Sequence, residues 1–232
     1  WCGIIPDTMA HFEIEVKSLL GEQERAEALK RKLCELDPNC SCVATSSQLN
    51  HYFHGGDIAQ LYENTEQLFT KEQQEKFTRI VEKGSDFSVR TREKDGEVLL
   101  VVKASLDAGT SENTVSRLEF EESVTVSLDE LDALVRESGY EYQAKWSRDR
   151  EEYAYRGANV CIDRNAGYGY LAEFEKVTDD EDSLPHVRAE LEALMAELGV
   201  AELPQERLAR MFEFYNQNWP EYYGTDRTFV IE

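Results

Sequence analysis

The stretch Glu13-Ile14-Glu15-Val16-Lys17 lies near the start of the sequence and alternates charged with apolar residues. This alternation predicts a β-strand, because successive side chains of a strand point to opposite faces of a sheet. Glu13, Glu15 and Lys17 then share one face, where two like charges repel each other. A divalent metal between the carboxylates would remove the repulsion, and the lysine could hold a phosphate oxygen beside it. The alternative is an ordinary solvated strand face, so the rest of the sequence has to decide.

The composition describes an acidic chain that is long enough for one generous domain. Its 232 residues are 41% hydrophobic, and 47 acidic against 25 basic residues give a net charge of −22. A surface of this sign does not suit nucleic acid or anionic lipid, so we expect no nucleic-acid partner and no membrane partner. A local basic pocket is still compatible with this total. The five cysteines lack zinc-site spacing, and we expect reduced thiols and a cytoplasmic location.

The order of predicted elements organises residues 9–232 as a single domain, with residues 1–8 as an extension or expression remnant outside it. A helical insert is expected at about 55–84, where Thr70 and Gln73 have the spacing of a capping box. From Ser85 the pattern alternates, and Asp95-Gly96 predicts a hairpin turn. Two helices at about 184–217 close the chain. About eight antiparallel strands with peripheral helices predict an α+β fold, built on a closed or nearly closed β-barrel.

Several later strands repeat the charged face of the first one. Carboxylate pairs on three strands and clusters of cations on three or four would line such a barrel with an acidic wall and a basic wall. Hard cations prefer oxygen ligands, and arginine suits phosphate. A metal-bound chain of phosphates needs both walls. The charges in question are Glu13, Glu15, Lys17, Arg90, Arg92, Lys103, Arg117, Glu119, Glu121, Lys145, Arg148, Arg150, Glu173 and Glu175. Lys145 and Arg148 differ in parity, so a bulge would be needed to unite them.

In this order, the motifs resemble those of the CYTH superfamily, the triphosphate tunnel metalloenzymes. The resemblance covers about Phe12 to Lys176. Its motifs are E-x-E-x-K at 13–17, R-x-R at 90–92, Lys103, R-x-E-x-E at 117–121, Lys145 with Arg148, Asp163 and a final E-x-E at 173–175. The first motif alone would be weak, but the ordered set is specific. The insert and the tail from Trp219 onward have no counterpart in the family pattern.

The resemblance implies an eight-stranded antiparallel tunnel that binds a small-molecule triphosphate with Mg²⁺ or Mn²⁺. It assigns Glu13, Glu15 and Lys17 to catalysis. Phosphate binding would fall to Lys17, Arg90, Arg92, Lys103, Arg117, Lys145 and Arg148. The metal ligands would be Glu13, Glu15, Glu119, Glu121, Glu173 and Glu175. Asp163 would either join the metal shell or act as a structural acceptor.

Three functions fit this resemblance. The first is a metal-dependent triphosphatase, acting on inorganic tripolyphosphate or on an organic triphosphate such as thiamine triphosphate. The second is a class IV adenylyl cyclase that converts ATP to cyclic AMP and pyrophosphate. The third is a binding module that holds a phosphorylated ligand without turnover. The sequence leaves open the substrate, the number of metals and whether the chain forms a homodimer.

Overall fold

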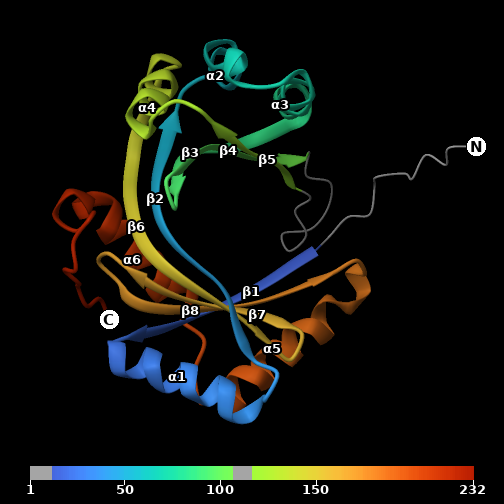
Figure 1. Ribbon diagram of the computed structural model, residues 1–232, viewed down its shortest axis with the longest axis vertical. Helices are drawn as coiled ribbons and strands as arrows, with labels where there is room; N and C mark the ends of the chain where they lie inside the picture. The colour runs from blue at the N-terminus through green and yellow to red at the C-terminus, as the bar shows by residue number, and fades with distance from the viewer. Residues whose placement is uncertain (1–11, 107–116) are drawn as a thin grey trace, which may run out of the picture.

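The computed structural model describes residues 12–106 and 117–232, so the expected extension at residues 1–8 lies outside the described part. One sheet of eight strands and six α-helices make up the fold (Figure 1). The strands are β1 (Phe12–Gly21), β2 (Ser41–Gly55), β3 (Gly84–Lys94), β4 (Glu97–Leu106), β5 (Arg117–Val124), β6 (Tyr140–Tyr155), β7 (Ala158–Asn165) and β8 (Gly169–Thr178). The α-helices are α1 (Gln23–Leu36), α2 (Ile58–Thr65), α3 (Lys71–Lys83), α4 (Leu128–Glu137), α5 (Leu184–Leu198) and α6 (Gln205–Asn218). Short 3-10 turns occur at η1 (Glu66–Leu68), η2 (Glu181–Ser183) and η3 (Trp219–Glu221).

The sheet is curled and antiparallel, but it is not a closed barrel. Its strand order is β1-β8-β7-β6-β2-β3-β4-β5, so β1 and β5 are the two edge strands. No ladder joins them within residues 12–106 and 117–232, which corrects the expectation of closure. Closure depends on how far twist and bending bring the first and last strands together, and a residue pattern within each strand does not contain that information.

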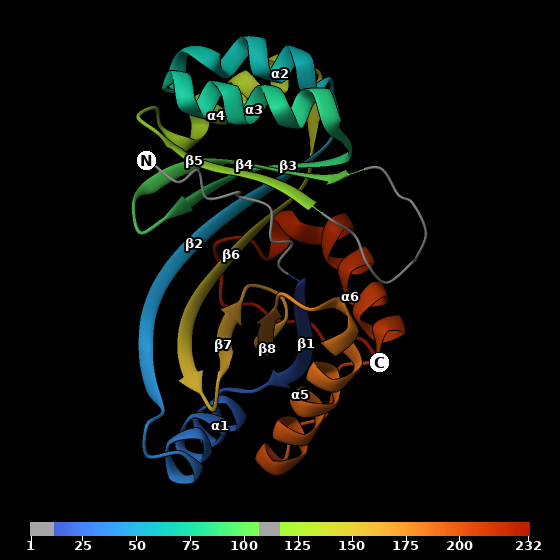
Figure 2. The same ribbon diagram turned by 90° about the vertical axis from the view of Figure 1, so that its right-hand side faces the viewer.

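Two long strands give the sheet its curvature. β2 has 15 residues and β6 has 16, and they pair with each other from Ser41 and Ala154 to Gly55 and Tyr140. One end of β2 also pairs with β3, and the opposite end of β6 pairs with β7. Figures 1 and 2 show both strands bending from an upper wall, formed with β3, β4 and β5, to a lower wall, formed with β7, β8 and β1.

Helices pack on the two walls and supply an upper and a lower apolar core, and a third core surrounds α6. Phe77 of α3 stacks on Phe120 of β5 with ring centres 4.6 Å apart, and Leu131 of α4 is buried in the same upper core. In the lower core, Leu29 of α1 and Leu191 of α5 pack with residues of β1, β7 and β8. The helical insert therefore backs the upper wall from outside.

Two local signals in the sequence have the predicted geometry. Thr70 and Gln73 form a reciprocal capping box at the start of α3. Asp95 and Gly96 both have positive φ, 53° and 87°, at the turn between β3 and β4. This is the backbone of a two-residue hairpin turn, in which positive φ is required at both positions.

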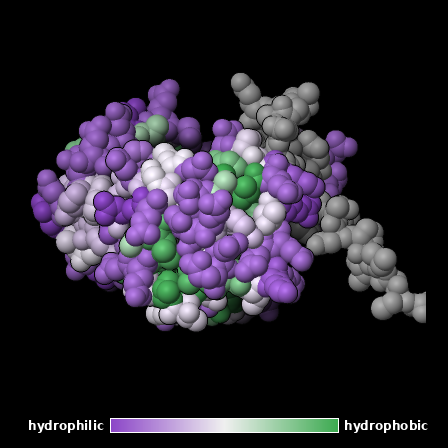
Figure 3. All heavy atoms as spheres, turned by 90° about the horizontal axis from the view of Figure 1, so that it is seen from above, coloured by the Kyte–Doolittle hydropathy of each residue, from purple (hydrophilic) through white to green (hydrophobic). Residues whose placement is uncertain are grey.

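The outer surface is mostly hydrophilic. In Figure 3, which views the molecule from the side of α2, α3 and α4, polar side chains dominate and apolar ones lie in the furrows between them. None of the described helices has the length and apolar character needed to span a bilayer. Cys34, Cys40, Cys42 and Cys161 are free thiols.

Candidate functional site

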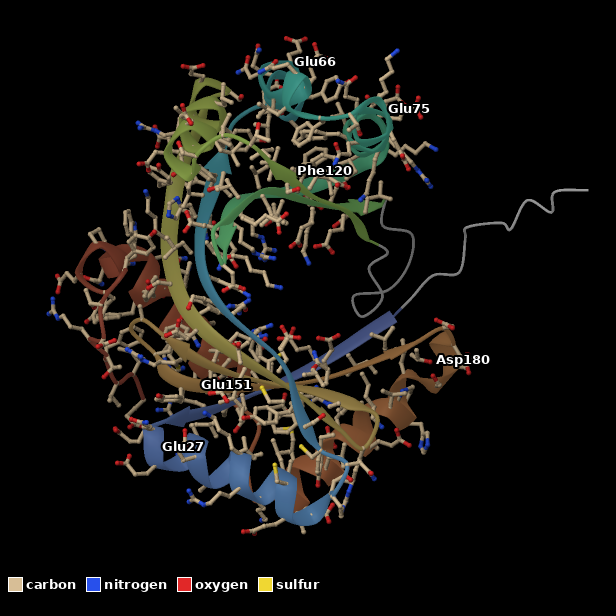
Figure 4. All side chains as sticks on the ribbon, viewed as in Figure 1. Glu27, Glu66, Glu75, Phe120, Glu151 and Asp180 are labelled. Carbon is tan, nitrogen blue, oxygen red and sulfur yellow. The ribbon has the colours of Figure 1, made fainter. Side chains whose placement is uncertain are left out.

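The concave face of the sheet encloses a cavity of about 1600 Å³. All eight strands contribute side chains to it, and so do α5 and α6. Figure 4 shows nitrogen and oxygen atoms of many side chains gathered in this space, whereas the labelled Phe120 points away from it toward the helices. Eleven of the residues predicted from the sequence line the cavity together: Glu15, Lys17, Arg90, Arg92, Lys103, Glu119, Glu121, Arg148, Asp163, Glu173 and Glu175.

The cavity is much less acidic than the chain as a whole. Its described lining has eight basic residues, Lys17, Arg90, Arg92, Lys94, Lys103, Arg148, Arg150 and Arg188. It also has eight acidic residues, Glu15, Glu119, Glu121, Glu152, Asp163, Glu173, Glu175 and Asp182. These are 8 of the 25 basic residues but only 8 of the 47 acidic ones. The described lining is thus formally neutral, although the chain as a whole carries a net charge of −22.

In the lower wall, the cations are held by carboxylates of neighbouring strands. Lys17 forms ion pairs with Glu15 and with Glu173, the latter at 3.2 Å. Arg150 donates from Nε and Nη2 to the two oxygens of Asp163, at 2.7 and 2.6 Å, and it also contacts Glu173. Arg148 donates to the same Asp163 at 3.0 Å. Ion pairs and hydrogen bonds therefore hold Lys17, Arg148 and Arg150 in defined positions inside the cavity.

In the upper wall, similar pairs surround Arg92. Its Nε donates to Asn50 Oδ1 at 2.8 Å, and its Nη1 donates to Glu121 Oε1 at 2.6 Å. Lys103 lies 3.0 Å from Glu119 on the adjacent strand. The upper and lower walls thus present the same alternation of cation and carboxylate across one cavity.

Arg90 is held differently from the other upper-wall cations. It donates to the Tyr52 hydroxyl at 3.0 Å, and its guanidinium lies 4.9 Å from the centre of the Tyr52 ring. Its Nε is buried and has no hydrogen-bond partner among the described residues. A buried donor without a partner is costly, so Arg90 is prepared to bind an acceptor that the protein itself does not supply.

The pKa values in the cavity follow from burial and from this pairing. Burial lowers the pKa of Arg92, and repulsion from Arg90 and Arg148 adds to the effect despite the opposing attraction of Glu121. Burial tends to raise the pKa of Glu173, but Lys17, Arg150 and Arg148 outweigh it, so the net pKa is lowered. For Arg150, burial tends to lower the pKa, and Asp163 and Glu173 more than offset it. Glu173 is consequently ionised at neutral pH and available as an anionic ligand.

The donor chemistry of the cavity fits a hard divalent cation. Six described glutamates line it, and carboxylate oxygens are the ligands that Mg²⁺ and Mn²⁺ prefer. Among the described side chains, no three Asp, Glu, His or Cys residues converge as a finished metal site. Instead Glu15, Glu119, Glu121 and Glu173 each contact a lysine or an arginine. These glutamates can bind a metal once the lysines and arginines that contact them bind another anion instead.

Lys145, which the sequence predicted in the phosphate-binding set, does not line the cavity. It is paired in register with His51, whereas Arg148 is paired with Gln48, so the two cations lie on opposite faces of β6. The register shift in this part of the ladder lies between Tyr52 and Phe53, beyond Lys145, and cannot turn it inward. The Lys145 ammonium instead lies 4.2 Å from the centre of the Tyr142 ring.

Lys145 borders a buried polar cluster on the outer face, centred on Asp132 of α4. The Asp132 carboxylate accepts hydrogen bonds from Thr91 at 2.6 Å, Tyr142 at 2.5 Å and His51 Nδ1 at 2.7 Å. His51 Nε2 lies 2.7 Å from the hydroxyl of Tyr223, which belongs to the C-terminal tail. The tail thus docks on the outer face of β2, next to β3, which carries Arg90 and Arg92.

Two predicted site residues cannot be placed by side chain. Glu13 lies on β1 and Arg117 begins β5, but the side chains of both fall outside the described residues. The predicted site set lacked Arg150, although it lies two residues beyond Arg148 and on the same strand face. The spacing of two residues from Arg148 was the signal in the sequence that could have placed Arg150 in the site. Gln48, Asn50 and Tyr52, neutral residues in the same lining, had no charge pattern to reveal them.

The sequence matches the model of the CYTH domain over residues 11–207. The chain belongs to the CYTH domain family. The match extends from β1 through α5, so it includes all strands of the curled sheet. A comparison with curated proteins gives no significant match.

Solved structures show the same fold at low sequence identity. A protein of Pyrococcus horikoshii is 20% identical, with a TM-score of 0.55 over 84% of this chain and 94% of that one. A protein of Vibrio parahaemolyticus, provisionally described as an adenylate cyclase, is 18% identical with a TM-score of 0.55, over 87% and 98% of the two chains. At these identities the likeness concerns the fold of the CYTH domain alone.

Proposed function

We propose that this CYTH protein is a divalent-metal-dependent hydrolase of triphosphate substrates. The observation that carries the proposal is the pairing of cations with carboxylates on two facing walls of one cavity. Lys17–Glu173 in the lower wall and Arg92–Glu121 in the upper wall are such pairs, at 3.2 and 2.6 Å. A single phosphate would need only one such group, whereas a chain of phosphates can contact both walls.

The residues of both walls would share the phosphate oxygens. Lys17, Arg148 and Arg150 would bind from below, and Arg90, Arg92 and Lys103 from above. Arginine is well suited to this task because its planar fork can make two hydrogen bonds to one phosphate. We extend the same role to Arg117 from its place in the motif. Glu13, Glu15, Glu173 and Glu175 would hold Mg²⁺ or Mn²⁺ below, and Glu119 and Glu121 above.

Substrate and metal would replace the existing ion pairs together. When a phosphate oxygen binds Lys17 or Arg92, the carboxylate that held this cation loses a partner. That carboxylate then has oxygens available for a divalent ion. This exchange keeps each buried charge paired throughout binding, which avoids the large cost of an isolated charge in the cavity. It also predicts that metal and triphosphate each raise the affinity for the other.

In the hydrolysis, a water oxygen forms a bond to the terminal phosphorus while the bridging P–O bond breaks. The departing diphosphate, or its organic ester, takes the electron pair of that bond, and the attacking water gives up a proton to bulk water. The cations of both walls neutralise the charge on the phosphate oxygens and keep the phosphates aligned for in-line attack. A bound divalent metal supplies further charge neutralisation and makes a coordinated water more acidic.

A turnover panel tests the proposal. Purified protein with Mg²⁺ or Mn²⁺ is given tripolyphosphate, thiamine triphosphate and ATP, and free phosphate and cyclic AMP are followed separately. A hydrolase should release free phosphate and form no cyclic AMP. Cyclic AMP with pyrophosphate would instead identify a cyclase, the alternative from sequence. Tight triphosphate binding without any product would identify a binding module and contradict the proposal.

Two variants with matched controls connect the activity to the cavity. Glu15→Gln is expected to lose most turnover while it keeps triphosphate binding, and Glu141→Gln on an exposed position of β6 should leave both unchanged. The double variant Arg90→Ala with Arg92→Ala should weaken every triphosphate ligand. The exposed Arg164→Ala is its control. Unchanged affinity in the double variant would exclude this cavity as the site.

A further inference from the structure

One buried carboxylate, that of Asp132, joins three neighbouring strands behind the cavity. It accepts hydrogen bonds from His51 of β2, Thr91 of β3 and Tyr142 of β6, at 2.5 to 2.7 Å. These strands are adjacent in the sheet, in the order β6-β2-β3, and Asp132 itself belongs to α4, which packs against β3 and β6. The carboxylate therefore ties the middle of the sheet to the helix behind it.

The strands are tied at the position that carries the upper-wall arginines. His51 and Thr91 are directly opposite each other in the ladder between β2 and β3. Since successive residues of a strand point to opposite faces, the pairs on either side of His51 and Thr91 point into the cavity. These two inward pairs are Asn50 with Arg92 and Tyr52 with Arg90, and each is hydrogen-bonded. A slip of one residue between β2 and β3 would turn both arginines out of the cavity.

The ladder between β2 and β6 is irregular at the same level. Tyr52 is paired with Ala144, but Phe53 is paired with Tyr142, so β6 has one extra residue here. A bulge of this kind disrupts the ladder locally and bends the strand. The Tyr142 hydroxyl, beside the bulge, donates to Asp132 at 2.5 Å. The carboxylate thus provides a fixed point where the backbone ladder is interrupted.

Asp132 is ionised inside the protein. The residue is 1% exposed, and although burial tends to raise its pKa, its three hydrogen-bond donors lower the net pKa. The Lys145 ammonium lies 3.7 Å from one of its oxygens. Stability alone does not explain such a group, because apolar residues of the same volume can often replace a buried charged cluster at little cost. The best-attested use of a buried charge is to fix the register of neighbouring elements, and here that register places Arg90 and Arg92.

The C-terminal tail completes this cluster through Tyr223. Burial raises the pKa of Tyr223 to about 12, so its hydroxyl is protonated at neutral pH and can donate to His51 Nε2, 2.7 Å away. In the neutral imidazole, Nδ1 then carries the proton and donates it to Asp132 at 2.7 Å. The tail therefore favours the tautomer of His51 that binds Asp132.

We propose that Asp132 is a positioning residue for the bound triphosphate, which acts through His51 and Thr91 on Arg90 and Arg92. The inference rests on the proposed function and deepens it, because it names what orients the upper-wall arginines toward phosphate. An arginine makes two hydrogen bonds to one phosphate only when its planar group is correctly aligned. A small displacement of β2 against β3 should therefore lower the affinity for phosphate, even though Asp132 lies on the opposite face of the sheet.

A double-mutant cycle tests the proposal with tripolyphosphate as the probe. Asp132→Asn should raise the Kd of tripolyphosphate about fivefold, measured by calorimetry at low salt. In the double variant Arg90→Ala with Arg92→Ala, the same substitution should change the Kd by less than about twofold, because the groups on which Asp132 acts are absent. In Lys17→Ala, which lacks a cation of the lower wall, the fivefold effect should remain. A fivefold effect of Asp132→Asn in both backgrounds would overturn the proposal.

Thr91 offers a second variant that leaves the carboxylate in place. Thr91→Val removes only the hydroxyl that binds Asp132 and should also raise the Kd of tripolyphosphate about fivefold. Thr91→Ser keeps this hydroxyl and should retain the wild-type affinity. Phe77→Ala, in the upper apolar core, is the control for a loss of stability without a loss of register. The proposal is wrong if Phe77→Ala raises the Kd as much as Asp132→Asn, or if neither Asp132→Asn nor Thr91→Val changes it.

Because the measured quantity is binding, failure of this inference can be told apart from failure of the proposed function. If tripolyphosphate binds without being hydrolysed, the proposed function fails, yet coupling between Asp132 and the two arginines still supports the inference. If hydrolysis occurs and the cycle shows no coupling, only the inference fails. A wild-type protein that does not bind tripolyphosphate would overturn both.

Discussion

Arg150 holds both carboxylate oxygens of Asp163, through Nε at 2.7 Å and Nη2 at 2.6 Å. Asp163 is fully buried, and one of its oxygens also accepts from Arg148. The sequence left two roles open for this aspartate, metal ligand or structural acceptor. With two guanidinium groups on its oxygens, Asp163 has the surroundings of an acceptor that orients Arg148 and Arg150 in the cavity.

Asp163→Asn is therefore expected to weaken triphosphate binding without changing the response to metal. The amide can accept at only one atom and leaves a buried guanidinium poorly compensated, so we expect Kd for tripolyphosphate to rise about tenfold. The Mg²⁺ concentration for half-maximal turnover should stay within about twofold. Calorimetry and a metal titration measure the two effects. Asp149→Asn, on the exposed outer face of β6, is the control, and a large shift of the metal midpoint would restore the metal-ligand role.

Arg148→Ala and Lys145→Ala should separate the two faces of β6. Removal of Arg148 takes a cation out of the cavity and should raise the Kd of tripolyphosphate about tenfold, a typical loss for one charge-assisted hydrogen bond. Removal of Lys145 takes a cation from the outer face and should change that Kd by less than about twofold. The affinities are measured at one salt concentration. Equal losses in both variants would contradict the assignment of the two faces.

Asp132→Asn should lower stability in a pH-dependent manner. Burial tends to raise the pKa of Asp132, but hydrogen bonds from His51, Thr91 and Tyr142 outweigh it, and its net pKa is lowered. Because the folded pKa lies below the unfolded one, near 3.9, the ionised group stabilises the fold above that value, and the stabilisation is lost as the pH falls. Urea unfolding should therefore show a wild-type advantage of about 1–3 kcal/mol at pH 7 that shrinks toward pH 3. An advantage independent of pH would contradict this linkage.

Phe77→Ala tests the role of the helical insert. Phe77 is fully buried and stacks on Phe120 of β5. Its removal leaves a cavity between α3 and the upper wall and should lower the free energy of unfolding by about 3–5 kcal/mol. Since the contact lies on the outer face, the KM for triphosphate should remain nearly unchanged. Denaturant unfolding and steady-state kinetics measure both quantities, with the exposed Val43→Ala as control. A large rise in KM would show that the insert shapes the cavity.

Much of the site was predictable because a strand has a period of two. Alternation alone places Glu15 with Lys17, Arg90 with Arg92, and Glu119 with Glu121 on shared faces, and the sheet then turns those faces inward. The same rule put Lys145 and Arg148 on different faces, and no register shift between them unites the two. Arg150 shared the parity of Arg148 but had no motif to single it out.

Other features depend on contacts between distant segments. The polar run at Ser41–Ser47 has no apolar alternation, and it becomes a strand because β6 pairs with it. Tyr223 is part of an aromatic tail without period, yet it meets His51 across 172 positions of sequence. The edge-to-face contacts among Trp146, Tyr168 and Phe212 join a strand, a turn and a helix. Such contacts are determined by tertiary packing, which local sequence patterns do not encode.

β2 and β6 run without interruption between the upper and the lower apolar core, so one pair of strands connects the two walls of the cavity. The spacing of the walls therefore depends on how far this pair of strands bends. A ligand that contacts one wall places no load on the bend. An anion long enough to contact both walls would act on it, so selection among phosphates would depend on the length of the ligand.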